Sequence, residues 1–464
     1  MSATLHFPVE VERDIAASLY RPLDENGLRR ITEAAFEVLE KSGLAVYSPT
    51  GLAAFEAAGA NVDPETRTAK LPRALVEDAI ASNPSSITLY ARDDVHHAVL
   101  ENDRVHVFTI NVFPNEIEDR DAIDVNRFFH ALDCTTKHVM GGVYSLKGCQ
   151  DVVAMTEMIA GSPEALRKRP FVSFITLVIS PFKIDERYGE MTCYFAQEGL
   201  PVVVPTEPIC GTTSPVTLAG NVLTHIAETL GGIALVQCVN TGAPGICGSV
   251  GSACDLRTMD HLGGPIERAM INAAVAQLAQ HFGLPLYSTA GTSDAKSVDT
   301  QAAYESALSN VLVAMSGANY IHDALGLMEA DLTVSYEKLV MDDEILGMCD
   351  RVLEGIEVSD ETLALELILG KGPGQDFLAE PHTVEHMRRE FFVPRLANRR
   401  KRAAWTPDDS ALARAKAFVA EVRASSSRTP GCCATTRPRR ASSRRPAPES
   451  GPAATARGSP CRRA

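Results

Sequence analysis

Apolar and polar residues follow two different patterns along the chain, and the change falls near residue 105. Residues 24–42 have the spacing of a helix that ends at Gly43, with one apolar stripe formed by Ile31, Ala35, Val38 and Leu39. Further short patterns predict helices at 51–58 and 75–81 and strands at 66–71 and 86–91. Residues 1–100 are therefore predicted to form a mainly helical N-terminal extension.

From residue 105 onward, short apolar runs alternate with longer helical patterns. The runs that read as strands are 105–110, 138–142, 171–176, 202–205, 245–249, 286–290 and 320–323. The helix predicted over 265–282 has a core stripe of Ile266, Met270, Ala274, Leu278 and Phe282. Another predicted helix runs to about Val239, with Ser214 as its N-cap and Pro215 at its first position.

Strands that alternate with helices over about 250 residues are typical of a parallel α/β fold. We predict a (β/α)8 TIM barrel over residues 101–400, together with C-terminal helices. The alternative is a doubly wound sheet, but no Gly-x-Gly-x-x-Gly turn follows a strand. A helix over 382–396 is expected to present Phe391, Phe392 and Val393 to the bottom of the barrel or to a subunit interface. A last helix is expected over 401–424.

The final 40 residues differ in composition from the rest of the chain. Residues 425–464 hold nine arginines, one glutamate and none of the large apolar residues, so we predict a disordered basic tail. One interpretation is a nucleic-acid-binding arm. We favour a frameshift product, because this composition is typical of GC-rich codons read out of frame.

Composition narrows the class of protein. The chain has 464 residues, 45% of them apolar and 22% charged, and a formal charge of −15 that argues against nucleic-acid or anionic-membrane partners. No apolar run approaches the roughly 20 residues of a membrane span, and residues 1–14 do not resemble a secretory signal. The eleven irregularly spaced cysteines are typical of cytosolic thiols. We expect a cytoplasmic enzyme.

Reactive groups of such barrels lie where strands end and loops begin. Segments 205–215, 245–252, 288–296 and 319–326 meet this description, and from them we predict catalytic roles for Glu207, Asp294 and His322. Glu207 could instead form a cap or an ion pair, and His322 could be a buried structural histidine.

Other reactive residue types have plainer explanations. Lys296 could be a Schiff-base lysine, but a surface lysine is the favoured interpretation. The cysteines at 210, 247 and 254 lack metal spacing, and the acidic run 342–344 is expected on a solvated or interface face. We find no metal motif, phosphate loop or catalytic triad, so no metal is expected.

Several long motifs occur in an order that resembles the trimethylamine methyltransferase family of corrinoid-dependent methylamine and betaine methyltransferases. They lie at 207–211, 215–220, 288–296, 319–328, 340–345 and 382–388. The resemblance covers residues 20–400 and implies the same barrel. Members that use trimethylamine carry pyrrolysine. This chain has only ordinary residues, with 291–293 as the neighbourhood of the missing group, and so resembles the non-pyrrolysine branch.

The resemblance implies transfer of a methyl group from a small quaternary amine, such as glycine betaine, to the Co(I) corrinoid of a separate corrinoid protein. Cobalamin would then be supplied by that partner rather than bound tightly, and no residue of this chain is assigned to it. The substrate-binding residues expected are Tyr320, Tyr304, Phe174, Ser249, Ser293, Gly291 and Asn319. The aromatic members would face the cation, and backbone N–H groups near the serines, with His322, would receive a carboxylate.

Two alternatives remain open at this stage. One is a non-catalytic quaternary-amine-binding paralogue, and the other is a barrel lyase or aldolase that uses Lys296. The apolar C-terminal helices also predict a homo-oligomer.

Overall fold

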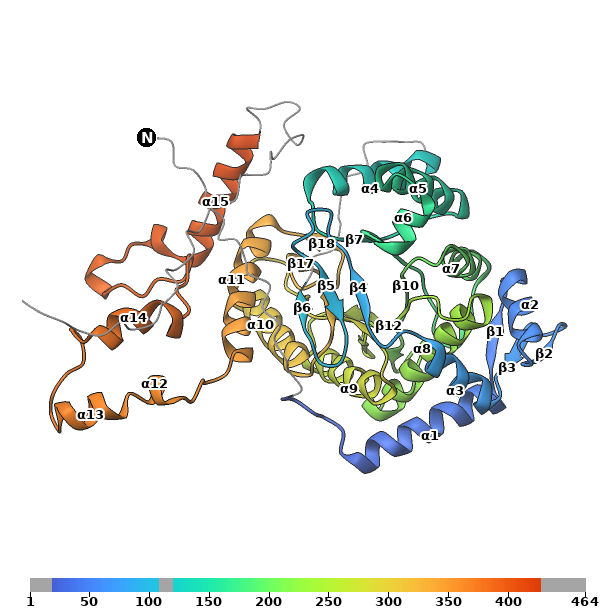
Figure 1. The fold of residues 1–464 in the computed structure, drawn as a ribbon, viewed down its shortest axis with the longest axis horizontal. Coiled ribbons are helices and arrows are strands. Elements are labelled where there is room, and N and C mark those ends of the chain that lie inside the picture. Colours follow the sequence, from blue (N-terminus) through green and yellow to red (C-terminus); the bar gives the residue numbers. More distant parts are fainter. Residues whose placement is uncertain (1–18, 108–119, 427–464) are drawn as a thin grey trace, which may run out of the picture.

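The computed structural model describes residues 19–107 and 120–426, so the predictions for residues 1–14 and for most of the basic tail lie outside it. Its centre is a parallel sheet of seven strands surrounded by helices (Figure 1). Each of the seven predicted strands has a counterpart: β6 (His106–Val107), β7 (Val139–Gly142), β8 (Val172–Ile175), β10 (Val202–Thr206), β12 (Gly245–Ser249), β15 (Leu286–Thr289) and β16 (Tyr320–His322). Residues 108–110 of the first prediction lie outside the described residues.

The strand order of this sheet is that of a barrel opened along one seam. From β7 to β16 the neighbours follow chain order, and β16 then pairs with β6, Tyr320 opposite His106. Between β6 and β7 no pairing occurs among the described residues, and the connection 108–119 is not described. The structure thus has a seven-stranded parallel sheet, and the closed eight-stranded barrel is not shown.

The two faces of the sheet pack into different cores because side chains alternate along each strand. The inner face contributes Val203, Ile246, Tyr287 and Tyr320 to one cluster. Their neighbours in the strands face the helices in the main core, among them Val202, Phe174, Cys247, Leu286 and Ile321. The helices that follow the strands are α4 (Arg120–Cys134), α5 (Leu146–Ala160), α6 (Pro163–Lys168), α7 (Glu186–Glu198), α8 (Leu218–Val239), α9 (Ile266–Phe282), α10 (Thr300–Met315) and α11 (Tyr336–Leu353).

A hairpin closes the inner face at the amino ends of the strands. It consists of β4 (Ile87–Leu89) and β5 (Ala98–Leu100), whose apolar residues join the inner cluster. The amide of Asn319, directly before β16, donates to the carbonyls of residues 101, 102 and 104 that follow the hairpin. The carboxyl ends of the strands form the opposite end of the sheet.

The N-terminal extension, described from residue 19, combines three helices with short strands. Its helices are α1 (Glu25–Lys41), α2 (Pro49–Ala57) and α3 (Arg73–Ser82), and Asp24 caps α1 through a 2.6 Å bond from the Gly27 amide. A four-stranded sheet joins β1 (Leu44–Val46), β2 (Asn61–Asp63) and β3 (Thr68–Lys70) to β9 (Lys183–Ile184). Because β9 lies between β8 and α7 in the chain, this sheet ties the extension to the body.

Helix α8 starts later than predicted. Thr217, rather than Ser214, is its N-cap and accepts a 3.3 Å bond from the Gly220 amide. The 22-residue helix is also long and apolar enough to cross a membrane, contrary to the expectation from sequence, but 83% of that apolar window is buried. It packs against α1, α3, α7 and α9, so it is the core helix of the fold.

Helix α9 has a wider buried surface than one stripe. Every residue from 271 to 279 is buried, whereas Ile266, placed in the predicted stripe, is exposed at the first turn. The reason is that α9 lies between α8 and α10 and also contacts β12 and β15.

The C-terminal part forms an arm that projects away from the sheet (Figure 1). It contains α12 (Asp360–Leu363), α13 (Leu365–Lys371) and α14 (Pro381–Glu390), and α15 (Ala411–Ser426) then returns to pack on α11. The helix predicted over 382–396 ends at Glu390, so Phe391 and Val393 follow it and are exposed. Between residues 356 and 393, which we call the arm, only His386 is buried.

Candidate active site

The carboxyl ends of the central strands carry a cluster of charged side chains. Glu207 follows β10 and, by alternation, lies on the same face as Val203, which points into the inner cluster. His322 ends β16 on the face of Tyr320. The loop after β10 contributes β11 (Ile209–Cys210), which pairs with β13 (Ser252–Asp255) and β14 (Asp260–Leu262) of the loop after β12 in a small sheet. The loop after β16 adds the hairpin of β17 (Leu327–Met328) and β18 (Thr333–Val334).

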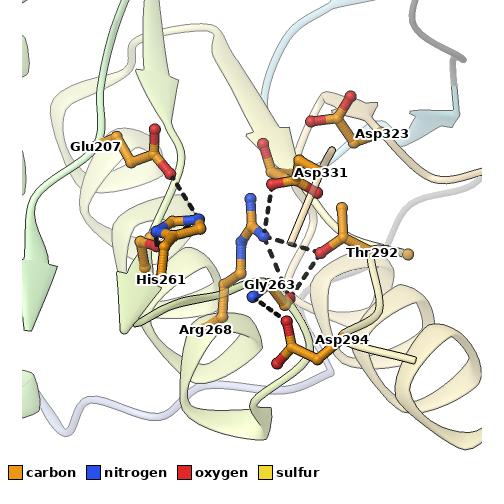
Figure 2. A network of polar contacts seen from close by, with 12 residues as sticks. Glu207, His261, Gly263, Arg268, Thr292, Asp294, Asp323 and Asp331 are labelled. Atoms are coloured by element: carbon orange, nitrogen blue, oxygen red, sulfur yellow. Dashed lines mark hydrogen bonds and ion pairs between the residues drawn. The ribbon is translucent and has the colours of Figure 1, made fainter. Parts of the chain in front are cut away.

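Arg268 lies at the centre of this cluster (Figure 2). It stands in the first turn of α9 and is only 3% exposed. Its Nη1 donates to the Gly263 carbonyl at 3.2 Å, to Thr292 Oγ1 at 2.9 Å and to Asp331 Oδ2 at 3.1 Å. A guanidinium from one helix is thereby fixed to the loops after β15 and β16.

Carboxylates surround this arginine. Glu207 Oε1 lies 3.5 Å from His261 Nε2, and Asp323 Oδ2 lies 2.7 Å from His322 Nδ1. Asp294 Oδ1 accepts a 2.7 Å bond from the Gly263 amide. Figure 2 shows Glu207 and His261 on one side of the guanidinium and Asp331 and Asp323 on the other.

The charges of the cluster act on one another. Burial lowers the pKa of Arg268, but the carboxylates of Asp331, Glu207 and Asp323 outweigh burial, so its pKa is raised and it stays a cation. Burial raises the pKa of the Glu207 carboxyl, and this outweighs the opposing charges of Arg268 and His261. Within 19–107 and 120–426, acidic side chains outnumber the one permanent cation of this cluster, so the site favours a positively charged group.

Several polar atoms of the cluster are buried without a partner in the part of the chain that the structure describes. They include Nε and Nη2 of Arg268, Oδ1 of Asp331 and Oδ1 of Asp323. Unpaired buried polar groups cost free energy, so their presence together marks a place prepared for a polar ligand or water. Within 19–107 and 120–426, no three His, Cys, Asp or Glu side chains are arranged to hold a metal ion.

A second buried ion pair supports the loops of the site. Lys338 Nζ donates to Asp342 Oδ2 at 2.6 Å and to the Gly291 carbonyl at 2.8 Å, while the other polar contacts of Asp342 include the Gly326 amide at 2.8 Å. Glu344 is also buried and accepts from the Leu396 and Ala397 amides. The expectation of a solvated or interface face at 342–344 is therefore wrong for Asp342 and Glu344, which are buried within the described chain.

The structure brings some of the predicted site residues to this cluster. Glu207, Asp294 and His322 lie at the carboxyl ends of β10, β15 and β16, as do Gly291 and Ser293. Gly291 has φ +80°, and a Cβ there would lie 2.3 Å from the Ala324 carbonyl oxygen. Ser293 donates to Glu305 on α10 at 2.6 Å. Tyr320 lies one step deeper on the inner face and stacks on Tyr287 with ring centroids 5.4 Å apart.

Other predicted residues lie elsewhere. Phe174 faces the helices, stacked on Phe195 at 3.9 Å, because it shares its strand face with Val172. Ser249 also faces a helix and donates to Asn272 on α9 at 2.7 Å. Asn319 lies at the amino end of β16, and Tyr304 is half exposed on α10.

Lys296 is exposed and is hydrogen-bonded through Nζ to the Asp294 carbonyl at 2.7 Å. It therefore has the surface position that the sequence favoured over a Schiff-base role.

Sequence reasoning missed Arg268, His261 and Asp331. His261 and Asp331 lie in long connections with no motif. Arg268 did carry a visible pattern, since it is the only lysine or arginine in a 17-residue helix that is otherwise largely apolar. A lone cation in such a helix must be paired or functional.

Comparison with known proteins places this chain in a family. The family model described as trimethylamine methyltransferase (MTTB) matches residues 9–125 and 116–425. Trimethylamine methyltransferase MttB of Desulfitobacterium hafniense strain DCB-2 is 34% identical over 417 residues, covering 82% of this chain and 84% of the relative. Glycine betaine methyltransferase of D. hafniense strain Y51 is 28% identical over 429 residues, covering 84% of this chain and 89% of the relative.

Among solved structures, monomethylamine methyltransferase MtmB of Methanosarcina barkeri is similar with a TM-score of 0.45 and 13% identity. The similarity covers 75% of this chain and 79% of that one. The match of the family model along nearly the whole described chain, with a relative at 34% identity, decides the assignment. This chain belongs to the trimethylamine methyltransferase family.

Proposed function

We propose that this protein transfers a methyl group from a small quaternary amine, such as glycine betaine, to the Co(I) corrinoid of a separate corrinoid protein. The observation that carries the proposal is the charge cluster at the carboxyl ends of the strands, in a chain of a methyltransferase family. An excess of carboxylates there favours a cationic substrate.

The reaction requires little from the protein beyond positioning the substrate. The corrinoid would supply the nucleophile that accepts the methyl group. A quaternary ammonium leaves as a neutral tertiary amine, so no general acid is needed at nitrogen. The residues of this chain would orient the cation and exclude water, with Glu207 and Asp323 as the nearest candidates for its positive charge.

The surface around the site fits a visiting protein. Exposed apolar side chains occur on the connections that follow four of the central strands, after β7, β10, β12 and β16. They are Tyr144, Val216, Leu256, Met259 and Leu332. A partner that carries a cofactor would find apolar contacts on several sides of the charged cluster.

Three further features complete the proposal. We propose that the barrel closes between β6 and β7, which the strand order supports. We propose a cytoplasmic location, which the eight free cysteines of the described chain support. We also propose that the exposed apolar arm pairs with a second copy of the chain.

A direct assay tests the transfer. Purified protein is mixed with a reduced corrinoid protein, and the absorbance of Co(I) is followed after glycine betaine is added. Loss of Co(I) with formation of one dimethylglycine per cobalt supports the proposal. If no methylated amine in a panel causes this loss, the proposal is wrong. Binding without methyl loss would favour the non-catalytic binder.

A further inference from the structure

The guanidinium of Arg268 uses only part of its hydrogen-bonding capacity. Its Nη1 has three acceptors, whereas Nε and Nη2 have none among the described residues and are fully covered. The Nε–H and one Nη2–H of an arginine point in the same direction, in the fork that matches the two oxygens of a carboxylate. The unused edge of Arg268 is thus the edge that binds a carboxylate side-on.

The charges around this edge specify what can occupy it. A simple anion would meet the carboxylates of Glu207, Asp323 and Asp331, whose charges act on Arg268. A simple cation would leave the guanidinium edge unpaired. A short zwitterion satisfies both, because its carboxylate pairs with Arg268 while its ammonium faces the carboxylates.

We propose that Arg268 determines substrate specificity by binding the carboxylate of a short zwitterionic quaternary amine. The assignment rests on the proposed function, because it names the group that distinguishes one quaternary amine from another. A ligand would reach the arginine past Glu207 and His261, whose side chains are 39% and 31% exposed. Their contact of 3.5 Å is long enough to be given up readily.

The test compares two ligands that share a cation. Glycine betaine and choline both carry a trimethylammonium group, but choline has a hydroxyl in place of the carboxylate. Calorimetric titration of the full-length protein should show betaine binding at least about 20-fold more tightly than choline, the size expected for a paired carboxylate. Equal binding of the two ligands would overturn the proposal without any variant.

Variants assign the preference to one side chain. In Arg268→Gln the ratio of the two affinities should fall below about threefold, and Arg268→Lys should retain charge but lose most of the preference. Arg257→Gln is the matched control, since Arg257 is exposed on the turn between β13 and β14 and pairs with Asp255 at 2.6 Å. It should keep the wild-type ratio. An unchanged ratio in Arg268→Lys or Arg268→Gln that unfolds at the wild-type temperature would contradict the proposal.

Failure of this inference is distinguishable from failure of the proposed function. If choline is demethylated with the same kcat/KM as glycine betaine, methyl transfer stands and the role of Arg268 is wrong. If neither ligand binds nor loses a methyl group, and other quaternary amines also fail, then both proposals fall.

Discussion

The carboxyl end of the sheet and the C-terminal arm both contain groups in unfavourable surroundings, but the groups are of opposite kinds. At the sheet, charged groups are buried, and polar atoms of Arg268, Asp323 and Asp331 lack partners among the described residues. In the arm, apolar groups are exposed, among them Ile356, Leu365, Leu369, Leu378 and Phe391. Folding alone leaves neither region at its lowest free energy, because buried polar atoms need partners and exposed apolar surface needs cover. A small polar ligand would pair the buried polar atoms of the first region, whereas a protein surface would cover the apolar side chains of the second.

The largest effect is expected from breaking the buried ion pair that supports the site. Lys338→Met should lower the free energy of unfolding by about 3–5 kcal/mol, because Asp342 would remain as a buried carboxylate without its cation. Lys41→Met is the control, since Lys41 is exposed and pairs with Glu37 with the same spacing of four residues. It should change stability by less than about 1 kcal/mol. If urea denaturation gave the same loss of unfolding free energy for Lys338→Met and Lys41→Met, burial of the ion pair would not explain its contribution to stability.

A pH-dependent effect is expected from Glu228 on α8, which is buried behind β10. Burial raises its pKa to about 7, against hydrogen bonds from Thr206, the Phe182 amide and Ser180. Between pH 5 and 7 the unfolded chain loses this proton while the native protein keeps it. Stability should therefore fall as pH rises, by up to about 3 kcal/mol.

Glu228→Gln should remove this slope, measured as the free energy of unfolding at pH 5, 6, 7 and 8. Glu190→Gln is the control, because hydrogen bonds from Ser48 and Thr50 outweigh burial and lower the pKa of Glu190. Because this pKa is lowered, the contribution of Glu190 to the free energy of unfolding changes only below pH 5. A slope that persists in Glu228→Gln would show that another group titrates.

The arm is expected to respond to added charge. Leu365→Glu with Leu369→Glu should weaken self-association at least about tenfold, because each buried leucine contributes about 1.5–3 kcal/mol. The unfolding temperature of the separated chain should not fall, since both side chains are already exposed in it. Sedimentation velocity over a concentration series provides the measurement.

The matched control for the arm is Met158→Glu, which places a charge on an exposed apolar residue of α5 in the body. It should leave self-association unchanged. A wild-type protein that sediments as a monomer at all concentrations would exclude pairing through the arm.

The smallest effect is expected at Lys296. Lys296→Ala should change the methyl-transfer rate by less than about twofold, because the side chain is exposed and bonds only a backbone carbonyl. Borohydride treatment with carbonyl compounds should attach nothing to this residue. Loss of activity in the variant, or a trapped adduct on Lys296, would favour the lyase alternative.

Alternation along strands could have improved the site prediction. Phe174 shares a strand face with Val172, and Ser249 shares one with Cys247, and these four face the helices. Applied to β10, the same rule places Glu207 inward with Val203. The sequence contained this information, but residue type rather than strand face guided the choice of aromatic residues.

The sequence by itself determined the seven strands of the sheet, because short apolar runs bounded by polar and glycine-rich turns can be buried in few other ways. It also placed Glu207, Asp294 and His322 at or after the carboxyl ends of those strands. Only the tertiary structure decided that Arg268 and His261 join them, and that Thr217 rather than Ser214 caps α8. Contacts between segments distant in the chain depend on how helices pack on the sheet, and no local pattern of residues encodes that packing.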